Sequence, residues 1–126
     1  PLESSYQRFG NNKAPRYISW SSENRSQLAR VPAAVGEYRR AELRSPDPMA
    51  NPYLSYALLI YAGMYGIENK LDLPPAAEIN FFKTDKTTAR QYKELPDTLE
   101  EAKALALKSS FITGHLPESI INIYCK

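Results

Sequence analysis

The feature that most constrains the fold is a run without charge near the middle of the chain. Residues 53–67 contain no charged side chain. Asn51 followed by Pro52 is a typical helix start, because an asparagine side chain caps the first free amides and proline tolerates the first helical position. The run is shorter than the roughly 20 apolar residues that a membrane span needs, and Gly63 and Gly66 interrupt it. The sequence therefore predicts a helix that is buried on nearly all sides in a domain core.

A strand with alternating charge precedes this helix. Residues 38–44 read as a strand, in which Arg40, Glu42 and Arg44 share one face because alternate side chains point the same way. Such a row suits a divalent cation on the carboxylate and an oxyanion on the guanidiniums. It equally suits a solvent-facing strand with paired charges, so spacing alone leaves both interpretations open.

The remaining elements are predicted to be short strands first and helices later. Residues 16–21 and 26–31 alternate as strands, and helices are expected over 98–109 and from 117 to the end. Thr98 and Glu101 form a capping-box pattern at the start of the first of these two helices. His115 lies in the predicted connection between them. The fold class is therefore α+β, with antiparallel strands in the first third followed by packed helices.

Composition indicates a globular chain and excludes several classes of protein. With 126 residues, 43% hydrophobic and 24% charged, the chain is neither disordered nor of low complexity. A net charge of +2 is too small to indicate a nucleic-acid partner, although the basic residues cluster in the first third and suggest a local anion site. Cys125 is the only cysteine, so an intramolecular disulfide is excluded and a reducing, cytoplasmic location is expected. Both ends look cut, which predicts a piece of a longer protein.

Three stretches together resemble glutamine synthetases. They are SYQRF at residues 5–9, NRSQLARVPAA at 24–34 and RRAELRSPDPMANPYLSYALLIYAGMYGIENK at 39–70. The resemblance is close over residues 4–75 and looser beyond. It implies that residues 1–126 are a fragment of one catalytic domain, from which the N-terminal domain, the upstream half of the catalytic domain and the extreme C-terminus are absent.

The resemblance also implies roles for five arginines. By it, the substrate glutamate is bound by Arg8, Arg25 and Arg44. ATP is bound by Arg25, Arg30 and Arg40. Arg25 contacts both substrates and is the candidate catalytic residue. Positions 25 and 30 would point to opposite faces if both lay on one strand. The side chains of Arg25 and Arg30 therefore converge on one site only if Arg25 belongs to the turn.

The reaction implied is glutamine synthesis from glutamate, ammonia and ATP. The γ-carboxylate is first phosphorylated, and ammonia then displaces phosphate from γ-glutamyl phosphate. Both steps spread negative charge over phosphoryl oxygens, which arginines and a divalent cation stabilise. Glu42 is the implied ligand of Mg²⁺ or Mn²⁺, while the other metal ligands belong to upstream sequence. The fragment is therefore expected to be inactive alone, and its parent to be a cytoplasmic homo-oligomer of stacked rings with no nucleic-acid or membrane partner.

The chain departs from the family pattern at the flap that covers the substrate. Family members carry a glutamate before an alanine-proline pair, where it helps ammonium lose a proton, whereas this chain has Lys13 before Ala14 and Pro15. Asn12 stands where a tyrosine is usual. Because a lysine repels ammonium, a ligase that joins glutamate to another amine stays open, as does a pseudoenzyme that binds nucleotide without turnover.

Two further expectations concern regulation and a different class of protein. Some bacterial family members carry a regulatory tyrosine where this chain has Phe82, in the triplet 80–82. Phenylalanine has no hydroxyl, so nucleotidylation is not expected there. A non-catalytic module that grips polyphosphate or nucleic acid, with Tyr17, Trp20 and Tyr38 for stacking, is the competing interpretation from another class.

Overall fold

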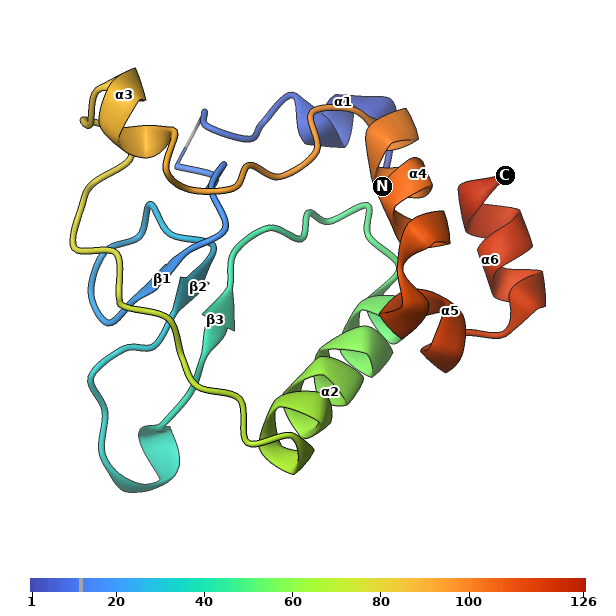
Figure 1. Ribbon diagram of the computed structural model, residues 1–126, viewed down its shortest axis with the longest axis horizontal. Helices are drawn as coiled ribbons and strands as arrows, with labels where there is room; N and C mark the ends of the chain where they lie inside the picture. Colours follow the sequence, from blue (N-terminus) through green and yellow to red (C-terminus); the bar gives the residue numbers. More distant parts are fainter. Residues whose placement is uncertain (12) are drawn as a thin grey trace. The chain divides into compact units, whose positions relative to one another are not determined.

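The computed structural model describes residues 1–11 and 13–126, and these form two compact units. The helical unit contains Pro1–Tyr6, Asp47–Leu73 and Pro96–Lys126, and the sheet unit contains Gln7–Pro46 and Pro74–Leu95. A three-stranded sheet and six α-helices confirm the α+β class (Figure 1). The predicted departure at Asn12 lies outside the described residues.

The sheet unit is built on three very short strands in the order β1, β2, β3. They are β1 (Trp20–Ser21), β2 (Ala29–Arg30) and β3 (Glu42–Leu43). β2 and β3 are antiparallel, as the sequence predicted, and their register places Arg30 opposite Glu42. β1 and β2 are parallel, so the antiparallel prediction is wrong for this pair. A 3-10 helix, η1 (Gly36–Tyr38), occupies the start of the predicted third strand.

The parallel pairing follows from a polar turn that sequence alternation did not reveal. Gln27 is fully buried, and its Nε2 donates hydrogen bonds to the carbonyls of Ala77 at 2.9 Å and Ile79 at 2.7 Å. The side-chain amide of Asn24 also donates to Ile79, at 2.8 Å. Residues 22–28 therefore fold against the segment 77–81, and they do not continue as a hairpin strand.

Aromatic rings pack the other end of the sheet unit. Phe81 stacks on Tyr17 with ring centroids 4.7 Å apart and meets Tyr92 edge-on at 5.0 Å. The short helix α3 (Lys86–Ala89) begins at Asp85, whose carboxylate caps two amides. Hydrogen bonds to Thr88 and Thr87 lower the pKa of Asp85, with the backbone amide of Thr88 the largest cause.

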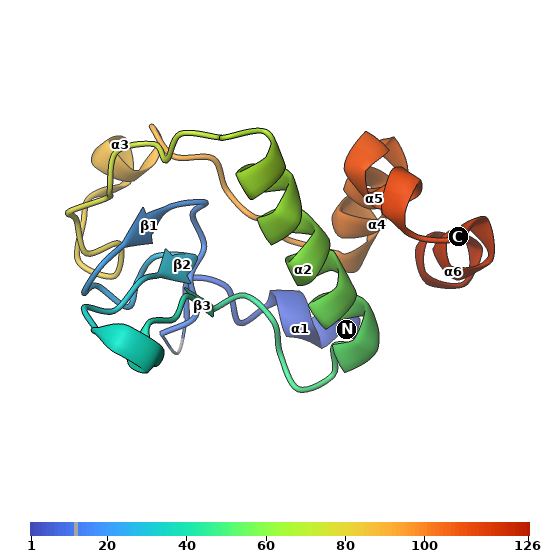
Figure 2. The ribbon, with the colours of Figure 1, turned by 90° about the horizontal axis from the view of Figure 1, so that it is seen from below.

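The helical unit contains the predicted central helix with the predicted start. Its elements are α1 (Glu3–Tyr6), α2 (Pro52–Glu68), α4 (Leu99–Lys108), α5 (Ser110–His115) and α6 (Glu118–Cys125). The side chain of Asn51 accepts hydrogen bonds from the amides of Tyr53 and Leu54, as an N-cap does. Figure 2 shows α4, α5 and α6 following one another, and α4 packs against both of its successors.

The prediction that α2 is buried on nearly all sides is wrong for this chain. No residue of α2 is buried, and Tyr53 is 85% exposed. The helix is apolar all round, but its partner in the helical unit is the short helix α5, against which Tyr65 meets Phe111 edge-on at 6.1 Å. Burial depends on neighbours that the local sequence does not specify. Among the described residues, no helix has both the length and the apolarity needed to cross a bilayer.

The later helices confirm one prediction and correct another. The amide of Glu101 donates to Thr98 Oγ at 3.1 Å, and the Glu101 carboxylate accepts from the amide of Asp97 at 2.8 Å, which is the predicted capping box. His115 ends α5 and does not lie in a connection. Ser109 explains the difference, because it caps α5 directly after α4 ends and extends helical structure beyond the predicted boundary.

Candidate anion-binding site

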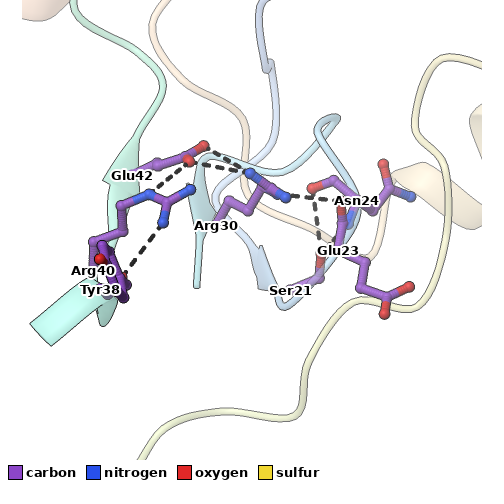
Figure 3. Close-up of polar contacts among 7 residues, drawn as sticks. All are labelled: Ser21, Glu23, Asn24, Arg30, Tyr38, Arg40 and Glu42. Carbon is purple, nitrogen blue, oxygen red and sulfur yellow. Dashed lines mark hydrogen bonds and ion pairs between the residues drawn. The ribbon is translucent and has the colours of Figure 1, made fainter. Parts of the chain in front are cut away.

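The predicted site residues lie in the sheet unit, where they form two groups and one separate arginine. The first group, which we call the carboxylate clamp, consists of Arg30, Glu42 and Arg40 (Figure 3). Arg30 Nη1 donates to both carboxylate oxygens of Glu42, at 3.0 and 3.1 Å. Arg40 Nε lies 3.4 Å from Oε1 of the same carboxylate. Pairing of β2 with β3 causes this arrangement, since Arg30 and Glu42 are opposite residues.

Two backbone carbonyls accept hydrogen bonds from the guanidiniums of the clamp. Arg30 Nε donates to the carbonyl of Glu23 at 3.2 Å, and Arg40 Nη1 donates to the carbonyl of Tyr38 at 3.4 Å. The Arg30 side chain is 17% exposed, whereas that of Arg40 is 54% exposed. Arg30 is therefore the fixed member of the clamp, and Arg40 is the more accessible one.

Glu42 is ionised under ordinary conditions. The hydrogen bonds from Arg30 lower the pKa of its carboxyl from the ordinary value of a glutamate, the positive charges of Arg30 and Arg40 lower it further, and partial loss of water opposes them. The clamp therefore holds one negative and two positive charges at neutral pH.

The described residues do not form a divalent-metal site on their own. A carboxylate offers about four lone-pair positions, and the two arginines occupy three of those on Glu42. In the described part of the chain, no three His, Cys, Asp or Glu residues are grouped so that they could hold a metal ion. The role of Glu42 as a ligand of Mg²⁺ or Mn²⁺ stays a prediction.

The second group surrounds a cavity of about 300 Å³ lined by Arg8, Lys13, Ala14 and Arg44. Its three charged lining residues are all cationic. Arg8 Nη1 donates to the carbonyl of Ser45 at 2.7 Å, and Arg44 Nη2 donates to the carbonyl of Lys13 at 3.0 Å. Strand parity placed Arg44 beside Glu42, but the structure places its side chain with Arg8 at this cavity, although the Arg44 amide still donates to the carbonyl of Leu28 at 2.9 Å.

Two details concern residues that line the cavity. Arg44 Nε is buried and has no hydrogen-bond partner among the described residues. Burying such a donor unpaired is costly. Lys13 has a left-handed backbone with φ 63°, an unfavourable conformation for a residue with a Cβ, in the turn where its carbonyl meets Arg44.

Arg25 lies in the turn after Asn24, the placement that its predicted role requires. It is exposed, and in the part of the chain that the structure describes no hydrogen bond or ion pair joins it to either group. Sequence reasoning missed the residues that shape this turn. Gln27 and Asn24 read as parts of a strand and a turn, and only the run of polar residues between two apolar stretches hinted at a buried network.

Comparison with known proteins identifies the family. Residues 1–126 match the family model described as glutamine synthetase, catalytic domain. The chain is 42% identical over 127 residues to a glutamine synthetase of Methanosarcina mazei, covering 98% of the chain and 28% of the relative. It is 43% identical over 123 residues to that of Thermus thermophilus, covering 95% and 28%, and 45% identical over 105 residues to that of Clostridium saccharobutylicum, covering 81% and 24%. The chain thus spans about a quarter of the length of these relatives. It belongs to the glutamine synthetase family, and its match lies in the catalytic-domain model of that family.

Proposed function

We propose that the full-length protein joins ammonia to the γ-carboxylate of glutamate, using ATP and passing through γ-glutamyl phosphate. The observation that carries this proposal is the meeting of Arg8 and Arg44 around one cationic cavity in a chain of the glutamine synthetase family. The two arginines were assigned to one ligand from sequence, although they are 36 positions apart (44 − 8 = 36).

In the proposed reaction the cavity holds glutamate. A carboxylate matches the planar donors of the two guanidiniums, Arg8 and Arg44, that line the cavity. Holding the substrate in one orientation makes the attack of its γ-carboxylate on ATP effectively intramolecular. Arg25 is proposed to bridge glutamate and the transferred phosphoryl group from its exposed turn.

The phosphates of ATP are proposed to bind Arg30 and Arg40, with Arg25 alongside. Phosphoryl transfer spreads charge over the equatorial oxygens, and positioned cations that match this charge lower the barrier. We propose Mg²⁺ or Mn²⁺ with ATP as co-substrate, held largely by residues outside this chain, because the described residues supply no complete metal site.

The activity is proposed for the whole protein and not for this chain. Residues beyond the chain make up most of the length of its relatives. The exposed apolar surface of α2 is expected to be covered by those residues or by a neighbouring subunit of a homo-oligomer, since large exposed apolar surfaces mark interaction sites. A cytoplasmic location remains our prediction, as does the absence of nucleotidylation at Phe82.

Lys13 supports a second candidate function, the ligation of glutamate to another amine. It adds a third positive charge to the cavity lining. A positive charge there repels ammonium, and it does not help ammonium to lose a proton as a carboxylate would. A neutral or carboxylate-bearing amine is repelled less. The same residue is compatible with a pseudoenzyme that binds nucleotide but does not turn over.

The test is release of phosphate by the full-length protein with Mg²⁺, ATP and glutamate, with ammonium compared to alkylamines, polyamines and amino acids. We expect release that depends on ammonium, with glutamine as product. Replacing Lys13 by glutamate is expected to lower KM for ammonium several-fold, and Lys83→Glu, an exposed lysine of the same unit, serves as its control. Release only with another amine establishes the second candidate, and ATP binding without release under any condition identifies a pseudoenzyme.

A further inference from the structure

We propose that Glu42 is an internal competitor for the anion that Arg30 and Arg40 bind, so that a polyphosphate enters by displacing this carboxylate. The inference rests on the proposed function, because it assumes that the two arginines receive a polyphosphate. If Glu42 only held the arginines in place, removing its charge would weaken anion binding. If it competes with the anion, removing its charge should tighten the binding of a polyphosphate in the absence of metal.

The contacts of the clamp make the competition direct. Arg30 Nη1 already donates to both oxygens of Glu42. Arg30 Nε is committed to the carbonyl of Glu23 at 3.2 Å. Arg30 Nη2 has no hydrogen-bond partner among the described residues, so a phosphate that binds Arg30 through two parallel bonds has to use Nη2 and Nη1, and at Nη1 it competes with the carboxylate.

The two arginines differ in how readily they give up the carboxylate. Arg40 is the more exposed and holds Glu42 by a longer contact of 3.4 Å, against 3.0 Å for Arg30. Arg30 is fixed by its carbonyl anchor and by its place opposite Glu42 in the sheet. We infer that an entering anion takes Arg40 first and then shares or replaces the bonds of Arg30.

This arrangement favours polyanions over monoanions. Glu42 is attached to the same fold, so it competes at a high effective concentration. A free monoanion that replaces it brings the same single negative charge to the two arginines, so the attraction is no stronger, and the monoanion also loses its translational freedom. A triphosphate brings several charges to the same two guanidiniums and overcomes the competitor. The clamp thus keeps Arg30 and Arg40 ordered, with one of their two positive charges offset, until a polyphosphate arrives.

The test is calorimetric binding of inorganic tripolyphosphate to the full-length protein in the presence of EDTA, so that no metal contributes. For Glu42→Gln we expect tripolyphosphate to bind about fivefold more tightly, because a negative charge next to the anion is lost. A single interaction between partly exposed charges changes an affinity by up to about this factor. Glu94→Gln is the matched control: Glu94 pairs with Arg16 at 2.9 Å in the same unit, and its loss should change affinity by less than about twofold. Unchanged or weaker binding by Glu42→Gln overturns the inference.

A second measurement covers the case in which Glu42→Gln is destabilised. In a crystal structure of the unaltered full-length protein with tripolyphosphate, the contact of Arg40 Nε with Glu42 should open beyond about 4 Å, the usual limit of an ion pair. An intact contact with the anion bound overturns the inference. Glutamine formation by the unaltered protein, together with unchanged tripolyphosphate affinity in Glu42→Gln, removes only the inference. Tighter binding without phosphate release on glutamate addition removes only the proposed function.

Discussion

Replacing Arg44 by lysine in the full-length protein is expected to lower kcat/KM for glutamate by about 100-fold, equivalent to about 3 kcal/mol of lost transition-state binding. Arg44 contributes a buried, unpaired Nε and an Nη2 that donates to the carbonyl of Lys13. A lysine keeps the charge but offers a single ammonium, which cannot donate to that carbonyl and to a carboxylate with the same planar geometry. The loss should therefore appear although the net charge of the cavity is unchanged.

The matched control for this substitution is Arg39→Lys. Arg39 is an exposed arginine of the same unit for which we propose no role, and its replacement should change kcat/KM by less than about twofold. Steady-state kinetics with glutamate as the varied substrate measure both. If Arg44→Lys retains kcat/KM within about fivefold, the assignment of glutamate to this cavity is wrong.

Replacing Gln27 by leucine is expected to increase hydrogen exchange of the Ala77 amide by about 30- to 1,000-fold, corresponding to roughly 2–4 kcal/mol of local stability. The substitution leaves the carbonyls of Ala77 and Ile79 without their bonds from Gln27, which is fully buried. The Ala77 amide itself donates to the carbonyl of Trp20 at 2.8 Å, so it reports on the same joint between the turn and the 77–81 segment.

Gln91→Leu provides the comparison for this experiment, since Gln91 is exposed in the same unit. Its exchange should match that of the unaltered protein within about twofold, in keeping with small effects at exposed positions. Mass spectrometry of the peptide that contains Ala77 resolves the two cases in the full-length protein. Equal protection in Gln27→Leu would show that the turn carrying Arg25 is held by other contacts.

The parts of the fold that sequence predicts are those decided by neighbours in the chain. Asn51 and Pro52 specify where α2 begins, because capping depends on a side chain and the amides two and three residues later. Thr98 and Glu101 specify the start of α4 in the same way. The alternation of residues 38–44 also brings Arg40 and Glu42 together, although only Glu42 and Leu43 form strand.

The parts that sequence did not predict depend on contacts between distant residues. Gln27 looks like a strand residue until its partners at Ala77 and Ile79 are known, and those partners make β1 and β2 parallel. Arg44 has the parity of Glu42, but its side chain lines the cavity with Arg8, a residue far away in the sequence. The division of the arginines into a clamp and a cavity therefore required the structure, whereas their gathering in one unit followed from the family resemblance.

The most direct test of the proposed reaction is transfer of oxygen from glutamate to phosphate in the full-length protein. With ¹⁸O in both positions of the γ-carboxylate, attack on the terminal phosphorus of ATP places one labelled oxygen in the bridge of γ-glutamyl phosphate. Ammonia then breaks the bond between the carbonyl carbon and that oxygen, so the label leaves with phosphate. We predict one ¹⁸O in each phosphate released, and one retained in glutamine, by mass spectrometry. Release of unlabelled phosphate while glutamine forms would contradict an acyl-phosphate route.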